Sequence, residues 1–123
     1  MAVTIATFLR LVDLLPEVER SEGPDWTGFK VHGKGFGYLW ERTATVGLKQ
    51  TIAEQLALVH ERPDVFEIQF TTGQFGWVVV RLDGIEPDEL SELTFEAWRL
   101  TAPAGLVDEQ GGSPPRLPVR RRS

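Results

Sequence analysis

The sequence predicts an α+β fold in which helices and strands follow the order α-β-β-β-α-β-β-α. Three observations carry this prediction. Apolar residues recur at helical spacing in three segments, apolar and polar residues alternate in several short segments, and glycine or proline separates most of these segments. The chain has 123 residues, of which 41% are apolar and 25% charged, and this composition fits one globular domain with a single core.

The helical spacing predicts helices over residues 5–15, 51–62 and 87–101. Pro16 ends the first helix, and Thr51 and Glu54 have the spacing of a capping box at the start of the second. Pro87 occupies the first turn of the third, where proline is favoured. The residues expected to face the core are Ile5, Phe8, Leu9, Val12 and Leu15, then Ile52, Leu56 and Val59, then Leu90, Leu93, Ala97 and Leu100.

Alternating segments predict strands over residues 26–32, 35–41, 44–49, 65–70 and 77–82, and residues 17–25 are expected to form a loop. Gly33 and Lys34 suit the two-residue type II′ turn of a hairpin. Strict alternation from that turn assigns the two faces of the sheet. The core face receives Thr27, Phe29, Val31, Phe36, Tyr38, Trp40, Val46, Leu48, Phe66, Ile68, Phe70, Val78, Val80 and Leu82. The opposite, open face receives Trp26, Lys30, His32, Gly35, Gly37, Leu39, Gly47, Lys49, Trp77, Val79 and Arg81.

The C-terminal segment differs in composition from the rest of the chain. Four of the 13 basic residues lie within residues 116–122, so residues 1–115 carry nine basic against 18 acidic side chains, a net charge of −9. We expect a folded domain over residues 1–107 and a flexible Gly/Pro/Arg-rich tail over residues 108–123. An acidic body repels polyanions on average, so any nucleic-acid site must be a local patch.

Four motifs follow one another along the chain. They are Phe29-Lys30-Val31-His32-Gly33-Lys34-Gly35-Phe36, Gly47-Leu48-Lys49, the strand from Gly76 to Leu82, and the closing helix from Glu89 to Arg99 with Ala102-Pro103 behind it. In this order they resemble the MmcQ/YjbR family over about residues 4–107. The resemblance implies a two-layer fold with helices on one face of an antiparallel sheet, similar to secretion chaperones. Family members are commonly called DNA-binding, and the resemblance brings no catalytic residues. Ser21 to Asp25 stand where many members have a histidine.

The residues offer little to an enzyme. The chain has no cysteine, and its two histidines, His32 and His60, lack the spacing of a metal site. No G-x-S-x-G elbow or phosphate loop is present. We therefore expect a non-enzymatic domain without cofactor or metal. We also expect no secretory signal, no membrane partner and a cytoplasmic location.

The predicted open face gathers basic and aromatic side chains in an otherwise acidic protein. Such a combination suits single-stranded nucleic acid, because bases stack on aromatic rings while basic groups contact phosphates. The candidate binding residues are Lys30, His32, Lys34, Lys49, Trp77 and Arg81. Two other interpretations remain open: the face is a protein interface, such as that of a chaperone-like homodimer, or its charged side chains are simply solvated.

Overall fold

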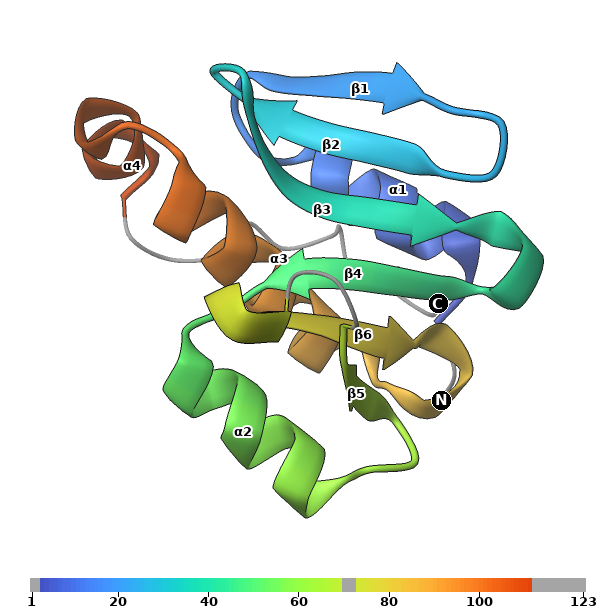
Figure 1. The fold of residues 1–123 in the computed structure, drawn as a ribbon. Coiled ribbons are helices and arrows are strands. Elements are labelled where there is room, and N and C mark those ends of the chain that lie inside the picture. The colour runs from blue at the N-terminus through green and yellow to red at the C-terminus, as the bar shows by residue number, and fades with distance from the viewer. Residues whose placement is uncertain (1–2, 70–72, 112–123) are drawn as a thin grey trace, which may run out of the picture.

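The computed structural model describes residues 3–69 and 73–111 (Figure 1). The helices are α1 (Ile5–Asp13), α2 (Ile52–Glu61), α3 (Pro87–Thr101) and α4 (Ala104–Gln110). The strands are β1 (Val18–Glu22), β2 (Thr27–Val31), β3 (Lys34–Trp40), β4 (Thr45–Lys49), β5 (Phe66–Ile68) and β6 (Trp77–Arg81). Three short 3-10 turns, η1 (Glu41–Thr43), η2 (Gly73–Phe75) and η3 (Leu82–Gly84), connect them.

The strands form one antiparallel sheet in the order β1-β2-β3-β4-β6-β5. In Figure 1, α1 and α3 lie behind this sheet, and α3 packs across the central strands β3 and β4. Helix α2 lies beside β5 and β6 at one end of the strand order. The predicted α+β class, with an antiparallel sheet and helices on one face, is confirmed.

Strand β1 occupies residues that were predicted to form a loop. It pairs with β2 along its full length, from Val18 opposite Val31 to Glu22 opposite Thr27. Because β1 is an edge strand with charged residues at three of its five positions, it buries little apolar surface and leaves a weak hydrophobic signal in the sequence. Backbone pairing with β2 holds it in place.

The β2–β3 hairpin differs from the prediction in its turn and its register. His32 and Gly33 are the central turn residues, and both have positive φ, 49° and 80°, as a type I′ turn requires. Lys30 pairs with Gly35 whereas Phe29 pairs with Gly37, so Phe36 is the extra residue of a β-bulge. The predicted strand position of His32 and the predicted type II′ turn are therefore wrong.

The bulge exchanges the faces of the residues that follow it on β3. Leu39 is fully buried in the core, although it was predicted on the open face. Tyr38 and Trp40 contact other rings on the open face, although they were predicted in the core. Gly37 faces the core as well, because a Cβ atom there would lie 3.2 Å from Leu48 Cδ2.

The core lies between the sheet and helices α1 and α3. Phe8 of α1 meets Phe29 of β2 edge-on at 5.5 Å between ring centroids, and Trp98 of α3 is fully buried. Trp98 Nε1 donates a hydrogen bond of 3.0 Å to the Pro16 carbonyl, which satisfies the polar end of this ring. Phe70, another predicted core residue, lies outside the described residues.

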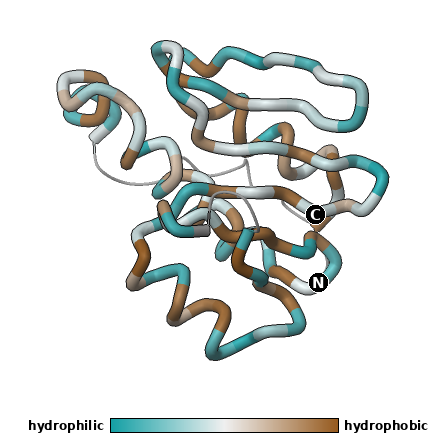
Figure 2. Tube along the Cα trace, in the orientation of Figure 1, coloured by the Kyte–Doolittle hydropathy of each residue, from teal (hydrophilic) through white to brown (hydrophobic). Residues whose placement is uncertain are grey.

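Helix α2 presents a different side to the core than its apolar spacing predicts. Ile52 and Leu56 are 53% and 52% exposed, and the inward position is taken by Gln55, whose Nε2 donates to the Trp77 carbonyl at 2.7 Å. Figure 2 shows brown, apolar segments recurring along helix α2. Ile68 on the edge strand β5, also predicted in the core, is 44% exposed.

The structure continues beyond the predicted domain boundary at residue 107. Helix α4 extends to Gln110 and ends at Gly111, whose φ of 94° is the left-handed conformation common at helix C-termini. Leu106 and Val107 of α4 pack against the core. The remaining predicted tail, residues 112–123, lies outside the described residues.

Candidate functional site

Four aromatic side chains on the open face pack against one another, and we call them the aromatic layer: Trp26, Tyr38, Trp40 and Trp77. The Tyr38 ring lies at its centre, with ring centroids 5.7 Å from Trp26, 6.2 Å from Trp40 and 5.5 Å from Trp77. Mutual contacts of this kind contribute to stability beyond the area they bury. The layer therefore covers the middle of the open face with the protein's own side chains.

Glycines beneath the aromatic layer explain how the rings reach the sheet. A Cβ atom at Gly28 would lie 3.1 Å from the Trp26 ring, and one at Gly47 would lie 3.0 Å from the Trp40 ring and 2.7 Å from Gln69 Oε1. Strand glycines often mark the close approach of another group. At Gly28 and Gly47 that group is a side chain of the same chain.

Two candidate residues are already engaged within the protein. Trp77 is only 8% exposed, so a base cannot stack on its face unless Tyr38 moves. Arg81 donates to Glu67 at 3.0 Å and to the Asp64 carbonyl at 2.9 Å. Both residues lie on the open face, but neither offers the free group that nucleic-acid contact requires.

His32 is also paired. Its Nε2 lies 2.7 Å from Glu17 Oε1 and joins the β2–β3 turn to the residue preceding β1. The two side chains line a hollow of about 400 Å³ together with Val18 and Glu19. His32 therefore closes the end of the β1–β2–β3 unit and lies beside, rather than within, the open face.

The chain's three lysines gather at one end of the sheet. Lys30 lies near the end of β2, Lys34 begins β3, and Lys49 ends the antiparallel strand β4. Lys30 and Lys49 belong to the open face, whereas Lys34 is opposite the core residue Val31 and thus belongs to the helix side. None of the three makes an ion pair within the described part of the chain.

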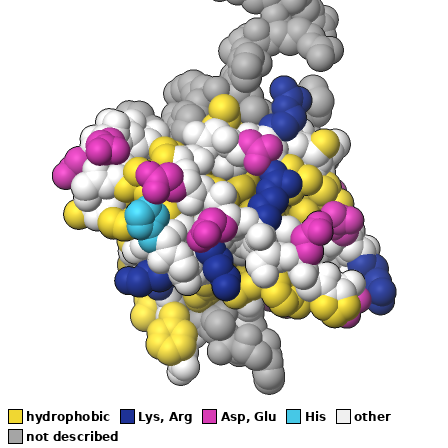
Figure 3. Space-filling model, turned by 90° about the horizontal axis from the view of Figure 1, so that it is seen from above, with side chains coloured by type: hydrophobic (Ala, Val, Ile, Leu, Met, Phe, Trp, Pro, Cys, Tyr) yellow, Lys and Arg dark blue, Asp and Glu magenta, His cyan; other side chains and the backbone are white. Residues whose placement is uncertain are grey.

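The arginines behave differently from the lysines. Five of the six arginines within residues 3–69 and 73–111 make ion pairs, and Arg10 is the exception; the pairs are Arg20–Asp13, Arg42–Asp25, Arg62–Glu89, Arg81–Glu67 and Arg99–Glu96. Figure 3, which views the molecule from above and thus from the side of β1, shows basic side chains interspersed with acidic ones. The described surface therefore shows no broad basic area on this side.

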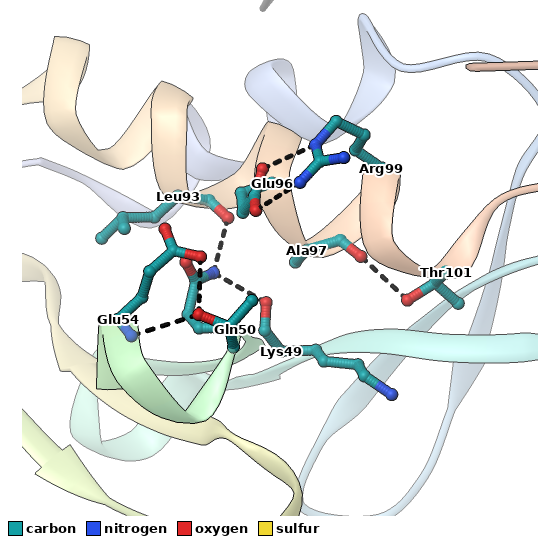
Figure 4. A network of polar contacts seen from close by, with 9 residues as sticks. Lys49, Gln50, Glu54, Leu93, Glu96, Ala97, Arg99 and Thr101 are labelled. Atoms are coloured by element: carbon teal, nitrogen blue, oxygen red, sulfur yellow. Dashed lines mark hydrogen bonds and ion pairs between the residues drawn. The ribbon is translucent and has the colours of Figure 1, made fainter. Parts of the chain in front are cut away.

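A buried glutamine fixes the end of β4, where Lys49 lies. Gln50 is 1% exposed, and its Nε2 donates to the Lys49 carbonyl at 2.7 Å and to the Leu93 carbonyl of α3 at 2.9 Å (Figure 4). At the start of α2, the Thr51 side chain accepts from the Glu54 backbone N–H at 3.1 Å, as the predicted capping box requires. This network ties the last residue of β4 to both α2 and α3.

On α3, Arg99 donates two hydrogen bonds to Glu96, of 2.7 and 2.6 Å (Figure 4). The hydrogen bond from Arg99, followed by its positive charge and a further hydrogen bond from Glu54, lowers the pKa of Glu96, against the opposing effect of burial. Hydrogen bonding to Glu96 likewise raises the pKa of Arg99. This pair is a stabilising surface contact on the helix side, away from the open face.

The sequence did not identify Tyr38 and Phe75 as candidate site residues. Phe75 of η2 is 60% exposed and lies two residues before Trp77, the partner of Lys49 in the sheet. The sequence placed it in a loop, and exposure of a loop residue leaves no periodic signal. Tyr38 was missed because the bulge reverses its face.

The opposite end of the open face is mainly acidic. A hollow of about 300 Å³ there is lined by Glu22, Asp25, Glu41 and Arg42 around Trp26. No helix of the described residues is long and apolar enough to cross a membrane. Residues 3–69 and 73–111 also contain no group of three His, Cys, Asp or Glu side chains placed to hold a metal ion.

The open-faced sheet, the helices behind it and the motifs along the strands define the class of this protein. The chain belongs to the YjbR family, whose model matches residues 14–100. Its structure is similar to the crystal structure of the Deinococcus radiodurans protein DR2400, a DUF419 domain, with a TM-score of 0.74 at 20% sequence identity over 89% of each chain. No curated protein matches the sequence.

Proposed function

We propose that this YjbR domain is a non-enzymatic binding domain that contacts single-stranded nucleic acid at the lysine end of its open sheet face. One observation carries the proposal: all three lysines lie at that end without ion pairs in the described structure, whereas most described arginines are paired. Phosphate neutralisation supplies most of the affinity of such complexes, and an unpaired ammonium group need not leave an ion pair first.

The exposure and pairing of the open-face side chains reduce the set of candidate contact residues. Lys30 and Lys49 on the open face are the phosphate-binding candidates, and Phe75 replaces Trp77 as the exposed ring on which a base can stack. The net charge of −5 opposes binding of a polyanion, so we expect an affinity of roughly 10⁻⁴ to 10⁻⁶ M at physiological salt. Affinity should fall steeply as salt is raised.

The homodimer alternative, with the sheet face as its interface, has less support. The aromatic layer already packs against itself, and Trp77 presents little surface to a second copy. Trp26 of the aromatic layer is 38% exposed, whereas the more exposed large apolar side chains lie elsewhere, on α2, β5 and η2. A mass measurement by light scattering, with and without an oligonucleotide, separates the two functions, because a homodimer keeps its mass when the oligonucleotide is absent.

The direct test is an amide-shift titration of the full chain with short single- and double-stranded oligonucleotides. Lys30→Ala and Lys49→Ala should each weaken binding of every sequence and together reduce the salt slope by about 1.4, since each phosphate contact to a single strand contributes about 0.7. Arg10→Ala is the matched control, because it removes the same charge from an exposed position on α1. Shifts that spare Lys30, Lys49 and Phe75 would refute the proposal.

A further inference from the structure

Lys30 of β2 and Lys49 of β4 lie on the two sides of β3, near Gly35. Gly35 faces the open side and pairs directly with Lys30 of β2. Lys49 follows Leu48, which pairs with Gly37 on the other side of β3. Strands lie about 4.8 Å apart, so the two lysine backbones are separated by about 10 Å, and their flexible four-carbon stems can bring both ammonium groups to one ligand.

Gly35, which has no side chain, leaves open space on the sheet between these lysines. A Cβ atom there would meet one neighbour within 4 Å, the Tyr38 hydroxyl at 3.5 Å. The Tyr38 ring is held by three tryptophans, so the position of its hydroxyl is set by the aromatic layer. This hydroxyl makes no hydrogen bond within the described residues, and its proton is therefore available to a ligand.

We infer that Lys30, Lys49 and the Tyr38 hydroxyl form a discrete subsite for one phosphate group above Gly35. The inference rests on the proposed function and specifies where a nucleic-acid phosphate is held. Two ammonium groups neutralise the charge of a phosphate, and the hydroxyl supplies a third donor from the strand between them. A tetrahedral oxyanion accepts hydrogen bonds from three directions at once, which matches donors on three neighbouring strands.

An acidic side chain lies opposite Lys30 in the sheet. Glu19 of β1 pairs in the sheet with Lys30, and its side chain faces the same side. No ion pair joins them in the described structure, but a carboxylate on the directly paired residue of the neighbouring strand competes with an anionic ligand for the ammonium group. Removing the Glu19 charge should therefore tighten phosphate binding, a gain that general weakening of the fold would not produce.

The experiment titrates the full chain with inorganic phosphate and, separately, with an unphosphorylated and a 5′-phosphorylated thymidine trinucleotide, while amide shifts are followed. We expect shifts centred on Gly35, Lys30 and Lys49. Tyr38→Phe, which keeps the ring, should weaken phosphate binding about threefold to tenfold, and each lysine-to-alanine change about tenfold. Glu19→Gln should strengthen it, and Lys34→Ala, at the same end but on the helix side, should change it little.

The three titrations distinguish failure of the subsite from failure of the proposed function. Phosphate binding that Tyr38→Phe leaves unchanged, or shifts centred on Lys34 or Arg10, would overturn the subsite, and trinucleotide binding at Lys30 and Lys49 would then still support the function. Phosphate binding that depends on Tyr38, without any response to either trinucleotide, would confirm the subsite and refute nucleic acid as its ligand. A response to the 5′-phosphorylated trinucleotide alone would identify a terminal phosphate monoester as the group bound.

Discussion

Leu39→Ala tests the β-bulge that sets the two faces of the sheet. Leu39 is fully buried, so its truncation should lower the free energy of unfolding by about 2–5 kcal/mol. Leu56→Ala makes the same chemical change at a position that is 52% exposed, and should cost at most about 1 kcal/mol. Urea unfolding resolves this difference, since a loss of 3 kcal/mol moves the midpoint by about 1–3 M.

The absence of cysteine from the chain allows a second measurement of the same feature. Strict alternation from the hairpin turn places Leu39 and Lys30 on one face, whereas the bulge buries Leu39 and leaves Lys30 exposed. Leu39→Cys should therefore react with a thiol reagent at least about 1,000-fold more slowly than Lys30→Cys, because labelling requires unfolding. Equal labelling rates in the native protein would show that the bulge is absent.

Three further predictions concern the backbone, an ion pair and the C-terminal segment. Gly76→Ala should destabilise the fold by at least about 2 kcal/mol, because φ is 94° and the new Cβ would lie 2.0 Å from a backbone oxygen. Gly105→Ala is the control, since open space surrounds Gly105, and its melting temperature should not fall as that of Gly76→Ala does. The hydrogen bond from Arg99 lowers the pKa of Glu96, so this carboxylate stabilises the fold above pH 4.5, and its contribution is lost as the pH falls through the pKa of the folded state. Glu96→Gln should therefore be less stable than the parent protein at neutral pH, and the two should approach each other in stability in acid unfolding experiments. Deleting residues 112–123 should leave the melting temperature within error but flatten the salt dependence of nucleic-acid binding, and equal slopes with and without this segment would show that its arginines make no contact.

Much of the fold was predictable because most elements obey one period along their length. Helix α3 begins at Pro87 and ends at Thr101, as predicted, because a proline marks its first turn and a strong apolar stripe defines its length. On β4 and β6 the alternation of core and open-face residues is correct, since no bulge interrupts the pairing of the two strands. The two faces of those strands follow directly from the sequence.

The errors in the sheet have one physical origin, because the choice of pairing partner and register is not determined by the local sequence pattern. Both His32-Gly33 and Gly33-Lys34 can form a hairpin turn, and the choice between them depends on register with β2. Tyr38 and Trp40 alternate as core residues would, yet the bulge at Phe36 turns them outward. Edge strand β1 has too little apolar surface to be detected without its partner.

The open face contains two regions with different surroundings. The aromatic layer stabilises the sheet, because its rings fill the space above strand glycines and contact one another. The Lys30–Lys49 pair lies beside this layer with no partner of its own in the described structure. Lys30 also lies opposite Glu19 of β1, without forming an ion pair with it in the described structure. The proposed phosphate would supply the ion pair that these two lysines lack.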